Sequence, residues 1–245
     1  MMYTDQLGTL INIPSTPSRI VCLVPSITEL LFDLGLGDNV VGCTKFCIHP
    51  NKPYLTKQMI GGTKDLNLKK ILDLHPDLIL ANKEENNKEQ ISFLSSSVPV
   101  WVSDVKTFDD SLKMIEQIGL ITNRATRASE ITDLLINNLK PKKPKKKAIY
   151  LIWKDPFMTV GGDTYISDIL HRCGYINTYA NQKRYPIITL EEIREHNPDV
   201  VLLSSEPYPF KEVHLNTIKK FLNNTEVELV DGEFFSWYGS RQLHT

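Results

Sequence analysis

An internal repeat constrains the fold of this chain more than any other feature. Residues 68–80 read LKKILDLHPDLIL, and residues 190–202 read LEEIREHNPDVVL. The copies align without gaps at an offset of 122 residues, so that Pro76-Asp77 corresponds to Pro198-Asp199. Each copy combines a short amphipathic helix, a Pro-Asp turn and an apolar run typical of a buried strand. Two copies are too few for a solenoid and indicate a duplicated domain.

The segments before the two copies also correspond. A basic residue begins an apolar run in each half, RIVCLV at 19–24 and KAIYLI at 147–152. A loop and a helical segment follow each run, at 29–34 and 165–171. Strands that alternate with helices predict a parallel sheet covered on both faces. We therefore predict an α/β fold with two lobes, each built on a parallel sheet.

The region between the halves has the pattern of a helix. Residues 107–140 carry apolar side chains at helical spacing, and Thr107 precedes Asp109 and Asp110 as an N-cap followed by first-turn acids. About 30 helical residues would span roughly 45 Å at 1.5 Å per residue. We predict one long helix over 107–140 that joins an N-terminal lobe, 1–106, to a C-terminal lobe, 141–245. Gly119 and the TNRATR stretch are the places where it would bend or divide.

Composition narrows the function. The chain has 28 basic and 29 acidic residues and a net charge of −1, whereas nucleic-acid binders have a basic excess, so no nucleic-acid partner is expected. The run PKKPKKK at 141–147 has two interpretations. The simpler interpretation is a solvated linker, and the more specific interpretation is a patch that binds nucleic acid or anionic lipid.

The cysteines and the N-terminus bear on location. The four cysteines are irregularly spaced and form no zinc-type quartet, which favours reduced thiols. The first 19 residues have no basic and apolar leader pattern, and no run is long enough to span a membrane. We therefore expect either a cytoplasmic protein or an exported one whose signal has been removed.

The candidate ligand site follows from the predicted sheets. Ligands of open α/β sheets bind beyond the carboxyl ends of the strands, so two facing lobes predict a cleft. Aromatic side chains and a few directional polar groups, the usual lining of a pocket, gather at these positions. Arginine suits bidentate binding of carboxylate or phosphate. The predicted ligand-binding residues are Pro25, Ser26, Phe46, His49, Thr63, Asn82, Glu84, Trp153, Lys154, Phe157, Arg184, Tyr185, Glu206, Trp237, Tyr238 and Arg241.

Enzymatic interpretations find little support. Cys47 and His49 lie on one loop without a third ligand, whereas zinc needs three or four. Glu84 and Glu85 are neighbours, whose side chains usually diverge, and Gly161–Thr164 has neither the lysine of a phosphate loop nor the spacing of a dinucleotide motif. We predict no catalytic residue, no covalent cofactor and no direct metal ligand. A metal- or thiol-dependent enzyme at the same cleft is the least favoured alternative.

Two long segments carry a resemblance. RIVCLVPSITELLFDLGLGDNVVG and IGGTKDLNLKKILDLHPDLILANKEEN resemble the substrate-binding proteins of ABC importers for siderophores, haem and cobalamin. The resemblance continues through IWKDPFMTVGGDTYISDIL, LLSSEPYPF and VDGEFFSWYGSR, so it covers nearly the whole chain. It implies two Rossmann-like lobes on a rigid backbone helix, an inter-lobe cleft for a metal chelate, a membrane permease as partner and no catalysis. It also implies a periplasmic or cell-surface location, and we expect a monomer.

The chain departs from this family at the docking positions. Family members dock on the permease through one glutamate per lobe, at the start of the repeat helix. The matching residues are Lys69 and Glu191, so the acid is present in the second half and its charge is reversed in the first. A lysine would repel basic permease residues, and Asp65 or Asp73 would have to substitute for the missing acid.

The pocket positions also bear on the ligand. Where cobalamin-binding relatives place tryptophans in the first lobe, this chain has Thr63 and Asn82. A siderophore with catecholate or carboxylate groups, bound through Arg184, Arg241 and Lys154, is therefore favoured over cobalamin. A cytoplasmic, non-transport binder of a small metabolite or corrinoid is the alternative function.

Overall fold

The computed structural model describes residues 1–50, 56–223 and 225–244, which form two compact units. Unit 1 comprises residues 1–105, 109–135 and 238–244, and unit 2 comprises residues 106–108 and 136–237. The units depart from the predicted lobes at the chain's end, because residues 238–244 belong to unit 1. None of the helices in the described residues combines the length and hydropathy needed to span a membrane.

Unit 1 is built on a parallel sheet in the order β5-β4-β3-β6-β7. Its strands are β3 (Ile20–Cys22), β4 (Val40–Cys43), β5 (Gln58–Met59), β6 (Leu78–Asn82) and β7 (Val100–Ser103). An antiparallel pair, β1 (Met2–Thr4) and β2 (Leu10–Asn12), precedes them, and a 3-10 turn spans Gly37–Asn39. Buried side chains run through whole strands, as expected for a sheet covered on both faces.

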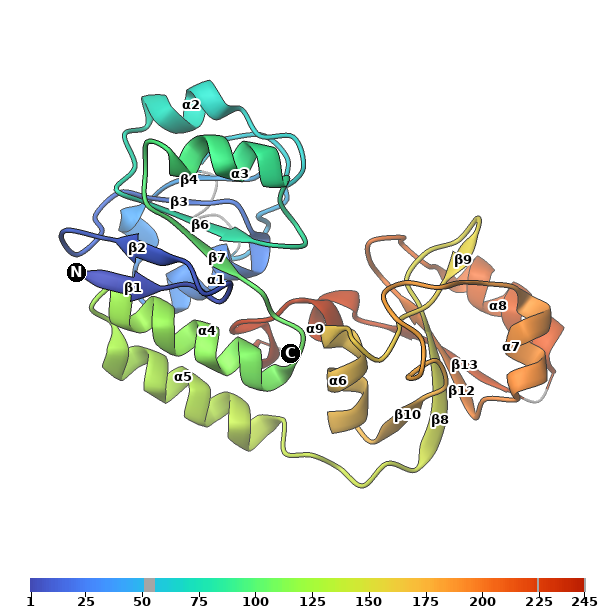
Figure 1. Cartoon of the computed structure of the whole chain (residues 1–245). Coiled ribbons are helices and arrows are strands. Elements are labelled where there is room, and N and C mark those ends of the chain that lie inside the picture. Colours follow the sequence, from blue (N-terminus) through green and yellow to red (C-terminus); the bar gives the residue numbers. More distant parts are fainter. Residues whose placement is uncertain (51–55, 224, 245) are drawn as a thin grey trace. The chain divides into compact units, whose positions relative to one another are not determined.

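Helices cover both faces of this sheet (Figure 1). On one face lie α2 (Leu68–Asp73) and α3 (Lys88–Ser95), and on the other lie α1 (Pro25–Asp33), α4 (Phe108–Ile121) and α5 (Ala125–Asn138). Alternate strand residues such as Val21 and Ile79 pack against Ile71 of α2 and Leu94 of α3.

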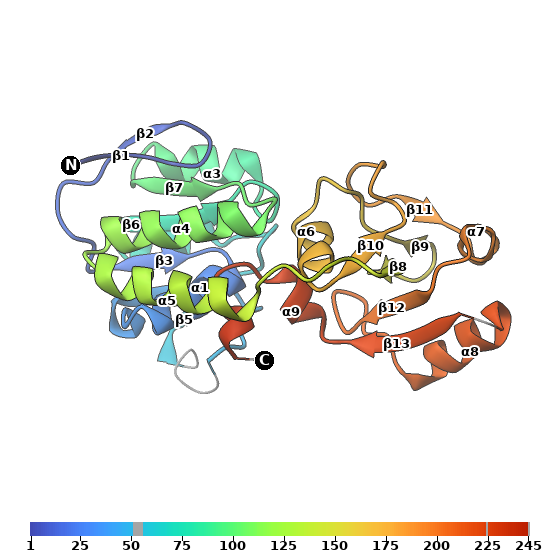
Figure 2. The same ribbon diagram turned by 90° about the horizontal axis from the view of Figure 1, so that it is seen from below.

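Unit 2 has a parallel sheet in the order β10-β8-β12-β13. Its elements are β8 (Lys146–Leu151), α6 (Tyr165–Arg172), β10 (Tyr175–Asn177), α7 (Leu190–His196), β12 (Val200–Ser204), α8 (Glu212–Leu222), β13 (Glu226–Val230) and α9 (Gly232–Ser236). A small antiparallel pair, β9 (Phe157–Met158) with β11 (Ile187–Ile188), lies beside it. Within the unit, α6 and α9 cover one face and α7 and α8 the other (Figure 2). The order β4-β3-β6-β7 of unit 1 recurs here, which confirms the predicted two-lobed α/β fold.

The Pro-Asp turn of the repeat holds the same contact in both units. In unit 1 the Asp77 carboxylate accepts hydrogen bonds from the backbone N–H of Ser18 and Arg19, at 2.8 and 2.9 Å. In unit 2 the Asp199 carboxylate accepts from the N–H of Lys147 at 2.6 Å. Each aspartate N–H in turn donates to the carbonyl of that basic residue at 2.9 Å. We refer to these paired contacts as the aspartate clamps.

The clamps coincide with identical strand registers. Ile20 of β3 lies opposite Leu78 of β6, and Ala148 of β8 lies opposite Val200 of β12. Before each turn the backbone adopts a positive φ, 48° at His75 and 46° at Asn197, positions that are again 122 residues apart. The residue before proline avoids the right-handed helical region, so each repeat helix ends where its turn begins.

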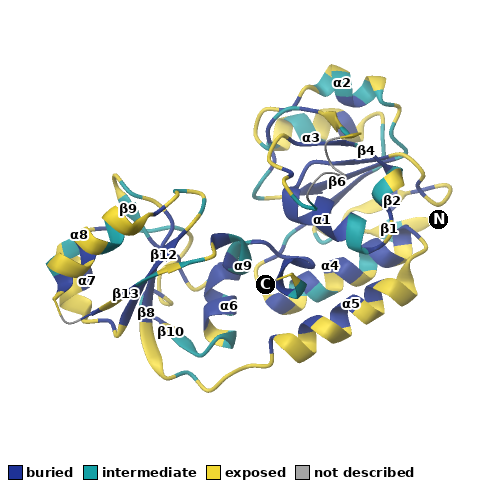
Figure 3. Cartoon of the chain, turned by 180° about the vertical axis from the view of Figure 1, so that it is seen from behind, coloured by how far each residue is buried: buried dark blue, intermediate teal, exposed yellow. Residues whose placement is uncertain are grey.

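The predicted helix over 107–140 is not continuous, and its break falls in the TNRATR stretch, one of the two places where division was expected. The chain leaves the helix after Ile121, reaches φ 56° at Asn123 and begins a second helix at Ala125. A Cβ on Gly119 would lie 2.4 Å from the Cβ of Ala128, so the glycine permits the close approach of α4 and α5. The apolar spacing that indicated one helix belongs to two helices that pack on the same unit, with Ile118 and Ile131 buried. Buried positions line the inner faces of both (Figure 3).

The aspartate clamps make a testable prediction. Asp77→Ala removes three hydrogen bonds to a carboxylate, two from Ser18 and one from Arg19, and we expect the free energy of unfolding to fall by about 2 kcal/mol. Asp199→Ala should cost about 1 kcal/mol. Asp73→Ala, at an exposed helical acid, is the control and should change the free energy by no more than about 0.5 kcal/mol. Urea denaturation measures all three, and equal effects would contradict the clamp.

Candidate ligand-binding site

An excursion at the end of β8 carries three of the seven candidate residues of unit 2, which are Trp153, Lys154 and Phe157. After Leu151 the chain forms a narrow hairpin in which Trp153 pairs with Met158, and Phe157 lies opposite Ile188 of β11. Trp153 is 40 % exposed, whereas Phe157 packs on the hydrophobic core of the unit. The hairpin therefore presents the tryptophan ring to solvent from an anchored base.

Trp153 packs against one of three further rings that contact one another. Its ring meets Tyr208 edge to face with centroids 5.7 Å apart, and Tyr208 meets Phe210 in the same way at 4.8 Å. Tyr208 and Phe210 also contact the ring of His214. The His214 Nδ1 accepts the N–H of Lys211 at 3.0 Å, and its Nε2 lies 3.3 Å from the Tyr208 hydroxyl. These four residues form the aromatic stack. Offset and edge-to-face rings stabilise one another, so the exposed face of Trp153 is held in one orientation.

Cations lie on the same excursion and on the segment that returns beside it. Lys154 pairs with Asp155 at 2.6 Å, and this hydrogen bond raises the pKa of the lysine. Arg184 is exposed and lies 5.4 Å from the centroid of the Tyr185 ring. Its φ of 61° is held by its N–H, which donates to the Asp163 carboxylate at 2.6 Å. Both predicted cations of unit 2 are thus accessible at its surface.

Glu206 follows β12 and is hydrogen-bonded by a residue of α9. The Ser236 hydroxyl donates to its carboxylate at 2.5 Å, and the Ser204 hydroxyl donates to its backbone carbonyl at 2.5 Å. Burial raises the pKa of Glu206, an effect that the Ser236 hydrogen bond opposes. Trp237, the residue after Ser236, is almost fully buried. Neither residue presents the open surface that Trp153 does.

In unit 1 the residues after β6 form a closed polar network. The amide of Asn82 donates to the carbonyl and hydroxyl of Ser103, and its oxygen accepts the N–H of Glu84 and Glu85. Asn86 donates to the carbonyl of Thr63 at 3.0 Å. Asn82 is buried and its amide hydrogen bonds are taken, so the structure gives it a structural role in place of the predicted contact with ligand.

The loop after β4 has an exposed and a buried side. Phe46 is 50 % exposed, with the Lys45 ammonium 5.2 Å from its ring centroid, and His49 is partly exposed. Cys47, between them, is fully buried, with its sulfur 3.3 Å from the Thr28 hydroxyl. The predicted residues Phe46 and His49 therefore lie at the surface of unit 1, whereas Pro25 and Ser26 are buried at the start of α1.

The C-terminal residues predicted to bind ligand fasten the chain's end to unit 1. Arg241 lies 3.3 Å from the Glu29 carboxylate, with side chains only 8 % and 4 % exposed. The Tyr238 hydroxyl donates to Glu85 at 2.6 Å, and the Gly239 N–H donates to Ser111 at 2.9 Å. The structure thus pairs Arg241 with a buried carboxylate, so its charge is used within the protein. No pattern in the sequence indicated Glu29 as the partner of Arg241 or Glu85 as the partner of Tyr238.

The buried thiols bear on the enzyme alternative. Cys22, Cys43 and Cys47 are fully buried, and all four cysteines are free. A hydrogen bond with Cys43 lowers the pKa of Cys47 to about 7, whereas burial raises the pKa of Cys22 to about 12. Among the described residues, no three His, Cys, Asp or Glu side chains are grouped so as to hold a metal ion. Cys47 is therefore closed to solvent, although its pKa is lowered.

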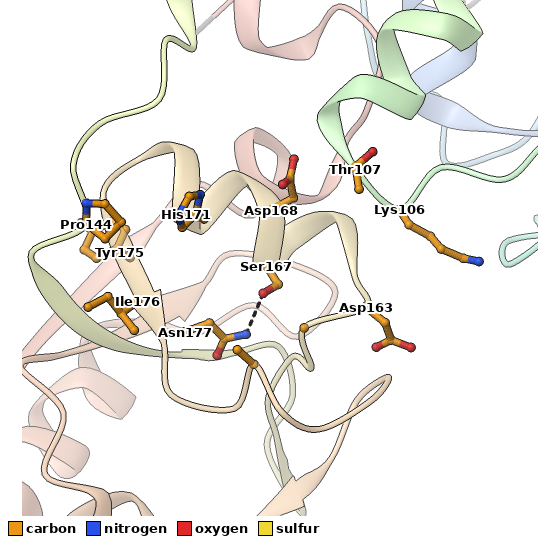
Figure 4. A pocket seen from close by; sticks show the side chains of 12 residues that line it. Lys106, Thr107, Pro144, Asp163, Ser167, Asp168, His171, Tyr175, Ile176 and Asn177 are labelled. Atoms are coloured by element: carbon orange, nitrogen blue, oxygen red, sulfur yellow. Dashed lines mark hydrogen bonds between the residues drawn. The ribbon is translucent and has the colours of Figure 1, made fainter.

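A pocket of about 740 Å³ in unit 2 is lined by other residues, although Asp163, which accepts the Arg184 N–H, borders it. It runs along α6 and β10 and contains none of the predicted ligand-binding side chains (Figure 4). Asn177 donates to the Ser167 hydroxyl at 2.9 Å across it, and Asp168 accepts the N–H of Phe108 at 2.8 Å. These polar groups of the pocket already bond within the protein.

The two predicted docking residues lie at equivalent places. Lys69 is in the first turn of α2, behind the N-cap Asn67, and Glu191 is in the first turn of α7, where Thr189 and Glu192 form a capping box. Both side chains are exposed. The structure therefore places opposite charges at the starts of the two repeat helices.

Substitution of Arg241 tests whether this residue has a structural role or binds the ligand. Burial raises the pKa of Glu29 and Arg241 opposes the rise, so Arg241→Ala should raise it further and reduce the free energy of unfolding by about 3 kcal/mol. A raised folded-state pKa lowers stability as the pH increases through it, so the loss should be smaller in acid than at neutral pH. Glu29→Gln/Arg241→Met is the control and should recover part of the stability. Urea denaturation as a function of pH tests this, and an unchanged stability would indicate a ligand contact.

The comparisons with known proteins agree with this fold. The family model described as periplasmic binding protein matches residues 20–230. An uncharacterized ABC transporter substrate-binding lipoprotein of Bacillus subtilis, YvrC, is 28 % identical over 207 residues, a match that covers 78 % of this chain and 65 % of that protein. The chain thus spans just under two thirds of this relative. A vitamin B12-binding protein of Vibrio parahaemolyticus is 25 % identical over 194 residues, covering 76 % and 70 %.

Solved structures give the same result. A protein of Staphylococcus epidermidis, described as a possible iron-binding solute-binding protein, is 28 % identical with a TM-score of 0.76, and the match covers 93 % of this chain and 95 % of that one. Solved haem- and siderophore-binding proteins share the fold at 19 % and 18 % identity, with TM-scores of 0.79 and 0.82. Since the family model spans nearly the whole chain and both parallel sheets, the chain belongs to the periplasmic binding protein family.

Proposed function

We propose that this chain is the substrate-binding protein of an ABC importer and captures a metal chelate. The observation that carries the proposal is the exposed face of Trp153, held by the aromatic stack at the carboxyl end of β8. Ligands of α/β sheets bind at such strand ends, and a rigid aromatic surface suits a flat or aromatic ligand. The ligand is cargo, and no covalent cofactor is part of the proposal.

The charges of unit 2 support an anionic chelate. Lys154 lies on the same excursion as Trp153 and Arg184 on the segment that pairs with it, and the exposed Arg184 can bind a carboxylate or catecholate in bidentate fashion. Arg241 is not part of this set, because it pairs with Glu29. A ferric siderophore with acidic groups is therefore favoured over cobalamin, which is the cargo named for the Vibrio relative. The cleft expected between the halves and the contributions of Phe46 and His49 stay predictions.

The proposal includes no catalytic step. The cysteine with the lowered pKa, Cys47, is a fully buried residue of the Thr44–His49 loop. The Bacillus relative is a lipoprotein of an ABC transporter, which supports a site of action on the outer side of the cytoplasmic membrane, next to a permease. We expect the chain to act there as a monomer.

Removing the exposed ring tests the binding proposal. Trp153→Ala should weaken the binding of the preferred chelate about fivefold or more, because stacking on an aromatic ring is worth about 1 kcal/mol or more. Tryptophan quenching by a panel of ferric siderophores, haem and cobalamin identifies the ligand, and equilibrium dialysis compares the affinities. Phe93→Ala, at an exposed ring on α3, is the control and should bind as the unchanged protein does. No binding of any chelate would refute the function.

The docking residues make a second prediction. If basic permease residues receive the starts of α2 and α7, Glu191→Lys should abolish association with the permease and Lys69→Glu should strengthen it several-fold. Surface plasmon resonance with the cognate permease in nanodiscs measures both. Glu195→Lys, which changes the same charge one turn further along α7, is the control. Equal responses of all three variants would show that the docking surface lies elsewhere.

A further inference from the structure

The lysine-rich segment of the sequence has no role in the proposed function. Six of the eight residues from Lys140 to Lys147 are lysines, and every one of these lysines is exposed. The whole chain has a net charge of −1, so this segment, the basic linker, is a strong local departure from a balanced composition. A run of this density at a surface attracts anionic partners.

The backbone of the basic linker is fixed on unit 2. The Lys142 N–H donates to the carbonyl of Arg172 at 3.0 Å, and the Lys145 N–H donates to the carbonyl of Gly174 at 2.9 Å. From Lys146 onward the chain is part of strand β8. Anchoring at both points holds the backbone of the segment along the connection between α6 and β10.

Few of these charges are balanced within the protein. Lys146 pairs with Glu226 at 2.6 Å. No carboxylate of the described residues forms an ion pair with Lys140, Lys142, Lys143 or Lys145. Four ammonium groups are therefore available to an outside partner.

An apolar margin borders the lysines. Ile176 of the edge strand β10 is 45 % exposed and lies opposite Lys147 in the sheet. Together with Pro144 and Tyr175 it lines one end of the 740 Å³ pocket (Figure 4). Cations beside an exposed aliphatic side chain and a hollow with an apolar wall match the chemistry of a lipid interface, where anionic headgroups lie above acyl chains.

We propose that the basic linker and the apolar margin of Pro144, Tyr175 and Ile176 form a surface that binds anionic membranes. Nucleic acid is the less suitable partner, because the linker contains no arginine for bidentate contacts and the chain as a whole has no basic excess. Four to eight clustered lysines are the pattern by which membrane-surface proteins bind acidic lipids. This surface adds to the proposed function and does not depend on the identity of the ligand.

Vesicle binding tests the proposal. The full chain should sediment with vesicles of phosphatidylcholine that contain about 30 mol % phosphatidylglycerol, and not with vesicles of pure phosphatidylcholine. Each lysine near the anionic surface should contribute about 1 kcal/mol to binding. Lys142→Gln/Lys143→Gln/Lys145→Gln should lower the partition coefficient about 100-fold, and raising the salt to about 1 M should have a similar effect on the unchanged chain. Ile176→Ser, which keeps the charge, should lower it about threefold or more.

A matched variant separates this surface from general charge. Lys183→Gln/Lys219→Gln/Lys220→Gln removes the same charge from exposed positions elsewhere on unit 2 and should leave vesicle binding nearly unchanged. Equal losses of vesicle binding in the two triple variants would overturn the proposal. Sedimentation of the unchanged chain that does not depend on phosphatidylglycerol would also overturn it. Tight binding of a single-stranded oligonucleotide without any vesicle binding would assign the linker to nucleic acid. Circular dichroism confirms that every variant is folded.

Discussion

The contact between the Pro-Asp turn and the start of the central strand determines much of this architecture. In each unit the aspartate carboxylate accepts the N–H of a basic residue at the start of the central strand, Arg19 or Lys147. The aspartate N–H in turn donates to the carbonyl of that residue. The pair Ile20 and Leu78 then adopts the same register as Ala148 and Val200. Since a shift by one residue would turn every strand side chain to the opposite face, this local contact decides which residues reach the core and which reach the strand ends.

The end of the chain places a second constraint on the structure. Residues 238–244 belong to unit 1, although the preceding hundred residues build unit 2. Their attachment relies on the pairing of Glu29 with Arg241 in a nearly dry environment, where losing one partner costs more than the pair itself contributes. An arginine at such a place is unsuited to releasing and rebinding a cargo. Arg184 on unit 2, in contrast, is exposed at the surface.

Much of the fold could be predicted because it is local and repeated. The matched segments 68–80 and 190–202 identified the helix, turn and strand that recur in both units. The single long helix was wrong because periodicity reports an apolar face and does not show where the chain folds back, although the TNRATR stretch that contains Asn123 was named as a place of division. The candidate site was harder still. Asn82 and Arg241 are polar residues at strand ends or loops, as ligand-binding residues are, but their partners Ser103 and Glu29 are distant in sequence.

The duplicated loops after β6 and β12 explain why the two units offer different surfaces. Asn82 corresponds to Ser204, Glu84 to Glu206 and Asn86 to Tyr208, at the same offset of 122 residues. In unit 1 the Asn86 side chain accepts the N–H of Asn82, which closes the loop, and donates to the carbonyls of Leu23 and Thr63 in neighbouring segments. In unit 2 Tyr208 supplies a ring in place of an amide, and that ring supports Trp153. A single exchange of amide for aromatic at one repeated position thus directs one copy toward internal hydrogen bonding and the other toward an exposed stacking surface.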